Sequence, residues 1–428
     1  MTTPATKKHP FYYILLLILA GEAVFILPFV LARIFRPTVL DVFDLTNLEL
    51  GVCFSIYGTV AFFSYVFGGS LADKFQPRVL MAAALFLTAI GGLFLAAFPS
   101  YGQLKVLYGY WGFTTIFLFW SAMIKATRIW GGEEKQGLAF GFLDGGRGLV
   151  AAGFGSLGIL IFSIFITSEI EDATLAERTD AFRYVILISS AIISTIGVLI
   201  LLFLRTNNSN YSSNPTLDRK ALWKKYTIAL KIPAVWLLMV IVLCAYVGYK
   251  ITDVFSLYAR EVMLYNEIES AQVGAFLLYI RPVVGVGIGL LADKTRVSLM
   301  MILAFLIMLI GAGLYASGII SPETSGLFFL SLIITAAGVY AFRTLYFAAM
   351  QEGLIPLAVT GTAVGLISLV GYTPDIFAGP AMGFLLDNSP GEVGHQHVFA
   401  MLAVFATIGL IASIRFYYIA AKKKNKNS

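Results

Sequence analysis

The chain has 428 residues, of which 59% are hydrophobic and 13% are charged. Soluble domains contain about 25% charged residues, so this composition excludes an ordinary soluble globular protein and indicates that lipid is the main solvent. The net charge of +6 does not indicate a nucleic-acid partner, because the basic residues fall in loops and tails between apolar runs, where they report membrane topology.

Apolar runs of membrane-spanning length follow one another along the chain. A spanning helix needs about 20 apolar residues, and barrel strands would be shorter and would alternate in polarity. The first run follows Lys7 and Lys8 without an evident cleavage site, which favours a spanning helix over a removed signal peptide. We predict an all-α polytopic membrane protein with twelve transmembrane helices at about 11–33, 49–71, 79–98, 104–127, 137–166, 179–204, 232–258, 268–291, 298–318, 326–350, 359–386 and 397–420.

The basic residues are distributed unevenly between the two sides of the predicted membrane. With the N-terminus inside, the cytoplasmic segments 7–8, 74–78, 128–135, 205–231, 294–296 and 422–426 contain most of the Lys and Arg residues. The opposite side has chiefly Arg36, Arg178 and Arg260, among many acids. This bias predicts a multi-pass protein with both termini in the cytoplasm, and we expect it in the bacterial inner membrane.

Two halves of the sequence resemble each other. The stretch 69–74 (GSLADK) recurs as 289–294 (GLLADK), and three glycines of the fifth run match three of the eleventh at a constant offset of 224. We predict one six-helix bundle at 1–204, a cytoplasmic linker at 205–231 and a second bundle at 232–428. Within the linker, 207–215 is rich in Asn and Ser and is typical of a flexible tether. The basic stretch 217–225 is either part of that tether, the simpler interpretation, or a short helix on the anionic inner leaflet.

The repeated loops resemble those of the major facilitator superfamily, whose pattern is Gly-x-x-x-Asp-Arg/Lys-x-Gly-x-Arg/Lys. Gly69, Asp73, Lys74 and Arg78 match it, whereas Gln76 replaces a glycine. The second copy, 289–296, fits more loosely. The resemblance covers nearly the whole chain and implies two pseudo-symmetric bundles, transport by alternating access, and no enzymatic activity. It also implies a cytoplasmic gate made by Gly69, Asp73, Lys74, Arg78, Arg128 and Asp293.

Ionisable residues inside the apolar runs are the candidate functional residues, since each costs about 2.5–3.5 kcal/mol to insert. We predict that Arg147, Arg281, Arg343, Lys250 and Tyr372 bind substrate. We predict that Glu22, Asp375 and Asp144 carry protons. Glu22, Arg281, Arg343 and Asp375 have no oppositely charged neighbour in sequence, so their partners must come from other helices or from substrate.

Alternative roles remain open for some charged residues. Asp144 and Arg147 are three positions apart on one helix face, as are Lys250 and Asp253, and either pair can be a purely structural ion pair. Arg33 lies near the outer end of the first run, where its side chain is expected to extend to the interface. The stretch 371–375 (GYTPD) should break the eleventh helix beside Asp375.

The interior cations favour a substrate with a carboxylate or phosphate group. The interior acids favour proton coupling, because desolvation favours the neutral form of a carboxyl group. We therefore predict a secondary active transporter of a small anionic solute. An anion exchanger, a drug or metabolite exporter, and a non-transporting sensor of the same fold are the alternatives. The interior cations count against the exporter.

We expect no cofactor, no metal and no nucleic-acid partner, and a monomer that interacts with substrate, protons and lipid. The chain has no phosphate-binding loop ending in Gly-Lys-Ser/Thr, which argues against an ATP-driven pump. His395 and His397 lie in the last predicted outer loop, where two histidines are a weak metal signal and exposed positions are expected.

Overall fold

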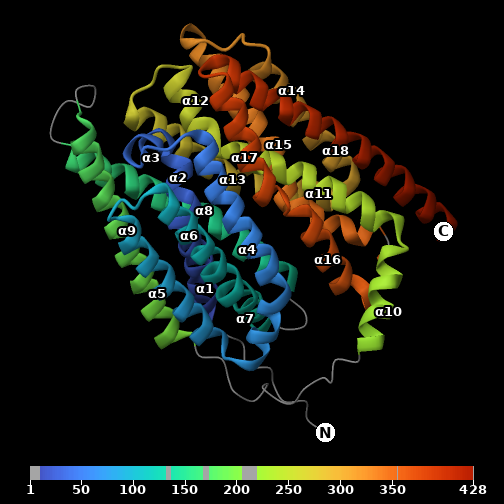
Figure 1. The fold of residues 1–428 in the computed structure, drawn as a ribbon. Coiled ribbons are helices and arrows are strands. Elements are labelled where there is room, and N and C mark those ends of the chain that lie inside the picture. Colours follow the sequence, from blue (N-terminus) through green and yellow to red (C-terminus); the bar gives the residue numbers. More distant parts are fainter. Residues whose placement is uncertain (1–9, 132–135, 167–172, 205–218, 354, 428) are drawn as a thin grey trace. The chain divides into compact units, whose positions relative to one another are not determined.

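The computed structural model describes residues 10–131, 136–166, 173–204, 219–353 and 355–427, and in these ranges every regular element is helical (Figure 1). The α-helices are α1 (Phe11–Phe25), α2 (Leu31–Ile34), α3 (Arg36–Val42), α4 (Asn47–Lys74), α5 (Pro77–Leu95), α6 (Tyr101–Gly112), α7 (Ser121–Gly131), α8 (Gln136–Phe165), α9 (Leu175–Phe203), α10 (Arg219–Leu230), α11 (Pro233–Ile251), α12 (Phe255–Glu261), α13 (Glu267–Lys294), α14 (Val297–Ala316), α15 (Ser325–Glu352), α16 (Leu357–Gly371), α17 (Pro374–Asn388) and α18 (Glu392–Asn427). Short π- or 3₁₀-helical stretches join some of them: η1 (Ile26–Val30), η2 (Phe113–Trp120), η5 (Thr252–Val254) and η6 (Pro322–Thr324).

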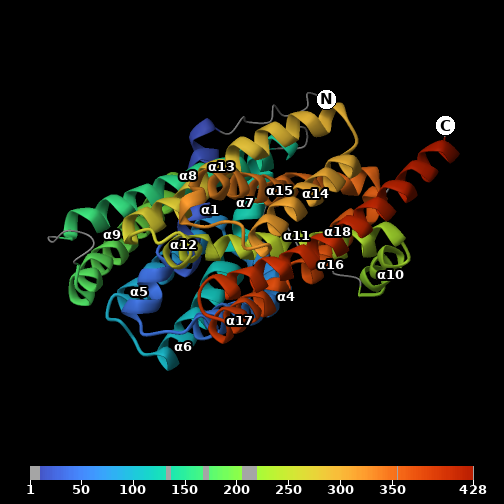
Figure 2. The ribbon, with the colours of Figure 1, turned by 90° about the horizontal axis from the view of Figure 1, so that it is seen from above.

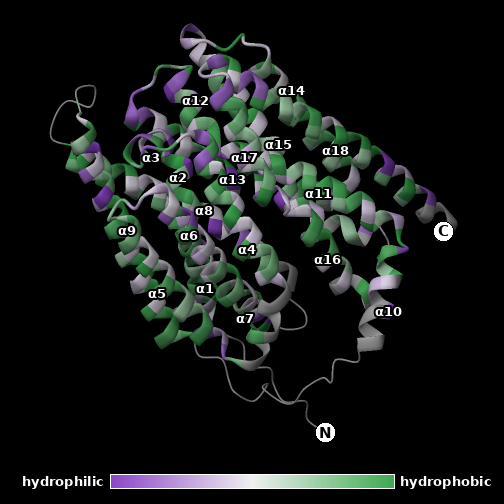
Figure 3. Cartoon of the chain, in the orientation of Figure 1, coloured by the Kyte–Doolittle hydropathy of each residue, from purple (hydrophilic) through white to green (hydrophobic). Residues whose placement is uncertain are grey.

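The prediction of an all-α membrane protein is confirmed. Among the described residues, eleven helical segments are long and apolar enough to cross a bilayer. The remaining predicted span, 104–127, lies in the continuous helical stretch α6–η2–α7, where tyrosine, tryptophan and glycine lower the mean hydropathy. Hydrophobic residues run along most of helices such as α5, α9 and α14 (Figure 3). In lipid a helix satisfies all of its own backbone groups, which is why these runs fold as helices.

Local signals in the sequence place several helix starts. Proline occupies the first turn of α5, α11 and α17, where the missing N–H group costs nothing. Thr174 and Asn266 begin capping boxes with Glu177 and Glu269, which satisfy the first backbone N–H groups of α9 and α13. The basic stretch after the predicted tether is helical as α10.

The chain groups into two compact units. Unit 1 is 1–32 with 59–212, and unit 2 is 33–58 with 213–428. In unit 1, α1 packs on α8 and α9, and α5 packs on α9. In unit 2, α14 lies beside α15 and α18, and α11 packs on α15, α16 and α18 (Figures 1 and 2). The buried apolar side chains of α11, α14, α15 and α18 form most of the core of unit 2.

The segment 33–58, which belongs to unit 2, packs against α17. The backbone of Gly51 in α4 approaches that of Gly379 in α17 so closely that a Cβ atom on Gly51 would lie 2.4 Å from the carbonyl oxygen of Gly379. Farther toward the start of α4, the carboxylate of Asp387 accepts hydrogen bonds from the backbone N–H groups of Asn47 and Leu48, at 3.0 and 2.7 Å. Glycine permits the close approach of the two helices, and a carboxylate at a helix N-terminus is stabilising.

Candidate functional site

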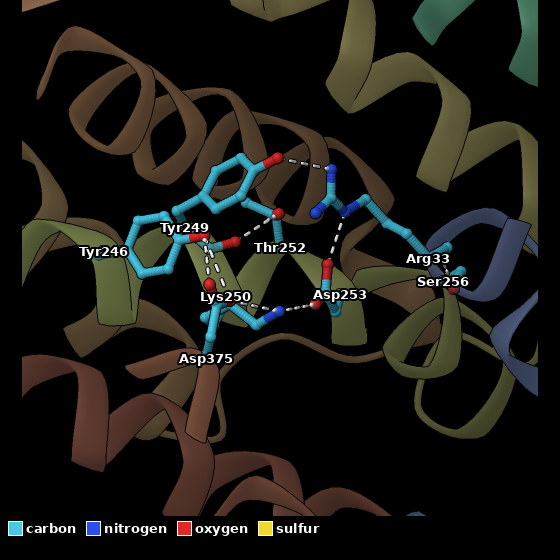
Figure 4. Close-up of polar contacts among 8 residues, drawn as sticks. All are labelled: Arg33, Tyr246, Tyr249, Lys250, Thr252, Asp253, Ser256 and Asp375. Carbon is cyan, nitrogen blue, oxygen red and sulfur yellow. Dashed lines mark hydrogen bonds and ion pairs between the residues drawn. The ribbon is translucent and has the colours of Figure 1, made fainter. Parts of the chain in front are cut away.

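A buried network of ion pairs lies inside unit 2 (Figure 4). The Nε atom of Arg33 lies 2.6 Å from Oδ1 of Asp253. The Nζ atom of Lys250 lies 3.4 Å from Oδ2 of Asp253 and 3.5 Å from Oδ1 of Asp375. The Tyr246 hydroxyl donates to both carboxylate oxygens of Asp375, at 3.2 and 3.1 Å. We call Arg33, Asp253, Lys250 and Asp375 the ion-pair network; it links the end of the first span to α11 and α17.

Local structure explains how Lys250 and Asp253 come to face each other. They are three residues apart, where α11 ends and the chain tightens into the 3₁₀ turn η5. The Thr252 hydroxyl donates to the backbone carbonyl of Tyr249, at 2.7 Å, and so holds this turn. The backbone carbonyl of Arg33 accepts a hydrogen bond from Ser256, at 2.7 Å, which anchors the first span beside α12.

Asp375 owes its position to a broken helix. α16 ends at Gly371 and α17 begins at Pro374, so the predicted break at 371–375 is confirmed. Asp375 is in the first turn of α17, where the helix dipole favours a negative charge. A Cβ atom on Gly58 would lie 2.6 Å from the backbone of Asp375, so the absence of a side chain there lets α4 pass close to the carboxylate.

A second group of cations meets around two tyrosines of unit 2. The guanidinium carbons of Arg33 and Arg343 lie 4.8 and 4.7 Å from the ring centroid of Tyr249, within cation–π range. Arg33 also donates to the Tyr249 hydroxyl, at 3.3 Å. The buried hydroxyl of Tyr340 lies within electrostatic range of Arg33, Arg281 and Arg343. We call these five residues the arginine cluster.

The sequence predicted only part of these two groups. Arg281, Arg343, Lys250 and Asp375 were candidates, and the structure brings them into neighbouring groups within unit 2. The expectation that Arg33 extends to the interface is wrong, because its side chain is 3% exposed and paired with Asp253. Tyr249 and Tyr340 were not singled out as site residues. A signal for Tyr340 was present, since it lies one helical turn before Arg343 on the same face of α15.

Tyr372 belongs to an aromatic group next to the ion-pair network. Its ring centroid lies 4.9 Å from that of Tyr246, and its hydroxyl oxygen lies 3.3 Å from that of Tyr346. Through Tyr246 this group contacts Asp375. It supplies flat surfaces and hydroxyl groups beside the charged side chains.

Unit 1 contains its own buried ion pair. The Nε atom of Arg147 in α8 lies 3.0 Å from Oε2 of Glu22 in α1, with both residues buried. The guanidinium lies 5.4 and 5.6 Å from the ring centroids of Phe25 and Trp120. A Cβ atom on Gly21 would lie 3.3 Å from Cδ of Arg147, so glycine makes room for the arginine. Glu22 thus receives a basic partner from another helix.

The structure shows the surroundings of Asp144 and of two of the predicted gate residues, Arg78 and Arg128. Asp144 is half-buried in α8, and the ion pair shown for Arg147 is with Glu22. Arg78 donates to Gln76, at 2.9 Å, and Arg128 is exposed near the end of α7. Gly69, Asp73 and Lys74 belong to α4 and Asp293 to α13, at positions whose side chains lie outside the described part of the structure.

The expectation that His395 is an exposed loop residue is wrong. It lies in α18 with 0% exposure, and its Nε2 atom is 2.9 Å from Oε2 of Glu261. His397 is exposed. In the ranges that the structure covers, no three His, Cys, Asp or Glu side chains gather in a way that could hold a metal ion.

Comparison with known proteins gives the family. The sequence profile of the Major Facilitator Superfamily matches residues 14–379. The chain belongs to the Major Facilitator Superfamily. It is therefore a multi-pass membrane transporter rather than an enzyme, and the predicted resemblance is confirmed.

Relatives and solved structures agree with this assignment. The Escherichia coli K12 inner membrane proteins YihN and YqcE are 27% and 25% identical; YihN aligns over 96% of each chain, and YqcE over 87% of this chain and 86% of its own. A bacterial homologue of the human lysosomal transporter Spinster, in an inward-facing and unoccupied conformation, has a TM-score of 0.72 at 16% identity, covering 98% of this chain and 99% of its own. The nucleoside transporter NupG has a TM-score of 0.66 at 16% identity, covering 95% and 99%. These two structures bear on the fold alone.

Proposed function

We propose that this transporter carries a small anionic solute, with a carboxylate or phosphate group, by alternating access driven by a proton gradient. The observation that carries the proposal is the position of Arg33 and Arg343 against the ring of Tyr249. Tyr249 directly precedes Lys250 in α11, and Tyr340 and Arg281 belong to the same cluster. Guanidinium groups offer planar, paired donors that match the oxygens of carboxylates and phosphates. Buried cations are costly unless they bind a ligand or a counter-ion, so a cluster of them favours an anionic cargo.

The ion-pair network suggests how protons and solute are coupled. Lys250 lies between Asp253 and Asp375, at 3.4 and 3.5 Å. A proton on Asp375 would cancel that carboxylate's charge and leave Lys250 available to the solute anion. Glu22, paired with Arg147 in unit 1, is the second candidate carrier, and Asp144 is the third. In this mechanism the total charge of the site stays nearly constant as proton and anion enter together.

The names of the relatives support the bacterial inner membrane as the location. The basic loops support cytoplasmic termini. Asp73 and Asp293, near the ends of α4 and α13, are proposed to close the cytoplasmic side, with Arg78 and Arg128 as basic groups of the same gate.

The proposal is tested with purified protein in proteoliposomes. A thermal-shift screen of organic acids, sugar phosphates and amino acids first selects a ligand, since ligand binding stabilises the native state. Uptake of that ligand is then measured with and without an imposed pH gradient, for wild type, Asp375→Asn and Glu22→Gln. Asp180→Asn is the control, because Asp180 is an exposed carboxylate in a surface pair with Arg183.

We expect uptake of an anionic ligand that requires the gradient in wild type and in the control, and that loses its gradient dependence in Asp375→Asn. Accumulation that ignores the gradient but depends on ligand loaded on the other side would identify an exchanger. Stabilisation by the cationic amino acids alone, with no response to the organic acids or sugar phosphates, would overturn the anionic cargo.

A further inference from the structure

The hydroxyl group of Tyr340 lies deep inside unit 2. The residue is 1% exposed, and the hydroxyl oxygen has no hydrogen-bond partner among the described residues. Most buried polar side-chain atoms in proteins are hydrogen-bonded, so an exception points to a water, an ion or a ligand that completes the set. Tyr340 is in α15, the helix that also contributes Arg343 to the arginine cluster.

The neighbours of this hydroxyl group are hydrogen-bond donors, and they indicate that it needs an acceptor. Arg33, Arg281 and Arg343 act on it electrostatically, and guanidinium groups are donors only. The hydroxyl of Tyr249 accepts a hydrogen bond from Arg33, at 3.3 Å, and is not hydrogen-bonded to Tyr340. The hydrogen of the Tyr340 hydroxyl therefore needs an acceptor that these arginines cannot provide.

An anion fits this requirement better than a water molecule. A carboxylate or phosphate oxygen accepts from several donors at once and offsets the positive charge of the arginines. A water molecule supplies an acceptor but no charge. The carboxylate of Asp253 does not fill this role: Arg33 holds its Oδ1 atom at 2.6 Å, and Oδ2, 3.4 Å from Lys250, has no hydrogen-bond partner among the described residues, so it does not accept from Tyr340.

We propose that Tyr340 binds the carboxylate or phosphate group of the transported solute directly, by donating its hydroxyl hydrogen, in a site completed by Arg33, Arg281 and Arg343. This inference rests on the proposed function, because it assumes an anionic cargo. It adds Tyr340 and Arg33 as residues that determine specificity. The donors then come from three parts of unit 2: the end of the first span, α13 and α15.

Both the position and the chemistry of Tyr340 favour selection of anions over neutral analogues. Arg343 and Tyr249 are half-buried, whereas Tyr340 is fully enclosed. A solute group that reaches Tyr340 has therefore left water and is surrounded by protein donors. A neutral group of the same shape would bring no negative charge to the cluster and fewer acceptor sites for its donors, which is how buried donors reject the wrong ligand.

The test compares wild type, Tyr340→Phe and a matched control, Ser331→Ala. Ser331 lies earlier in α15, is also fully buried, and its hydroxyl oxygen likewise has no hydrogen-bond partner among the described residues. Binding of inorganic phosphate, succinate and glycerol 3-phosphate is measured by titration calorimetry in nanodiscs of phosphatidylcholine. Thermal unfolding without ligand is measured on the same samples.

We expect at least one probe to bind wild type and to bind Tyr340→Phe about tenfold more weakly, the equivalent of one hydrogen bond to a charged group. Ser331→Ala should bind like wild type. Tyr340→Phe should unfold at the wild-type temperature or above, because it loses an unsatisfied polar atom. Failure of Tyr340→Phe to fold would show that the hydroxyl has a structural partner and would overturn the proposal.

Two other results separate this inference from the proposed function. Equal affinity of wild type and Tyr340→Phe for a probe that binds would overturn the role of Tyr340 and leave the anionic cargo intact. Binding of none of the probes, together with no response to any acidic compound in the ligand screen, would overturn both. The last measurement uses nanodiscs that contain phosphatidylglycerol. If this lipid alone stabilises wild type but not Tyr340→Phe, the ligand is a lipid headgroup. That result would overturn the proposal that Tyr340 binds the transported solute.

Discussion

Arg33 and Asp253 are 220 positions apart in the sequence and form an ion pair in which Nε and Oδ1 are separated by 2.6 Å. Their side chains are only 3% and 2% exposed. Removing one member of a buried pair leaves an uncompensated charge, which is far more costly than losing a surface pair. Asp253 has a second basic neighbour, Lys250, whereas the ion pair shown for Arg33 is the one with Asp253. The two members of the pair are therefore not equivalent.

Asp253→Asn should lower the free energy of unfolding by about 3–5 kcal/mol. Arg33→Gln should cost less, because Lys250 still lies beside Asp253. The measurement is denaturant unfolding in one fixed detergent. Asp180→Asn, which removes an exposed pair with Arg183, serves as the control and should cost no more than about 1 kcal/mol. A loss for Asp253→Asn as small as that of the control would contradict the importance of the network.

Asp387→Ala should loosen the start of α4. The carboxylate caps the N–H groups of Asn47 and Leu48 from another helix, and loss of a helix cap costs about 0.5–2 kcal/mol. Hydrogen exchange of these two amides should become faster, while the amides in the middle of α14 stay unchanged. Asp387→Asn should have a smaller effect, because its side-chain oxygen still accepts a hydrogen bond. Unchanged exchange in the alanine variant would show that the cap contributes nothing.

Arg281→Lys should weaken binding of the anionic solute by about tenfold or more, although the positive charge is retained. The lysine ammonium group lacks the planar fork of the guanidinium, and a hydrogen bond between charged groups contributes about 1.5–3 kcal/mol. The dissociation constant is measured by titration calorimetry. Arg296→Lys is the matched control, since Arg296 is exposed and rests on the ring of Tyr417. An unchanged constant for Arg281→Lys would remove Arg281 from the binding residues.

Asp73→Asn should slow transport much more than it weakens binding. The residue matches the family's loop pattern between Gly69 and Arg78, at the predicted cytoplasmic end of the second span. We expect this carboxylate to pair with basic groups only when the cytoplasmic side of the transporter is closed. Such a pair stabilises one conformation without contacting the solute. Transport rate and dissociation constant are compared in the same preparation. Wild-type transport rates in the variant would exclude a gating role.

Much of the fold could be predicted from the sequence. The spans follow from run length, since lipid forces an apolar segment of that length to satisfy its own backbone groups as a helix. The break between Gly371 and Pro374 follows from proline chemistry. Ionisable residues inside apolar runs, such as Arg281 and Asp375, stood out because their cost there is large wherever they point.

Which segments are helical and which charges lie among apolar residues could be read from the sequence alone, because these are local properties of composition and spacing. The partners of these charged residues became known only from the folded structure. Arg147 pairs with Glu22 from α1, Arg33 pairs with Asp253 instead of extending to the interface, and His395 contacts Glu261 inside the protein instead of lying in an exposed loop. Each of these pairs joins helices that are distant in sequence. Which faces of two helices meet depends on how all the side chains of a unit pack together, and no spacing within a single run encodes that.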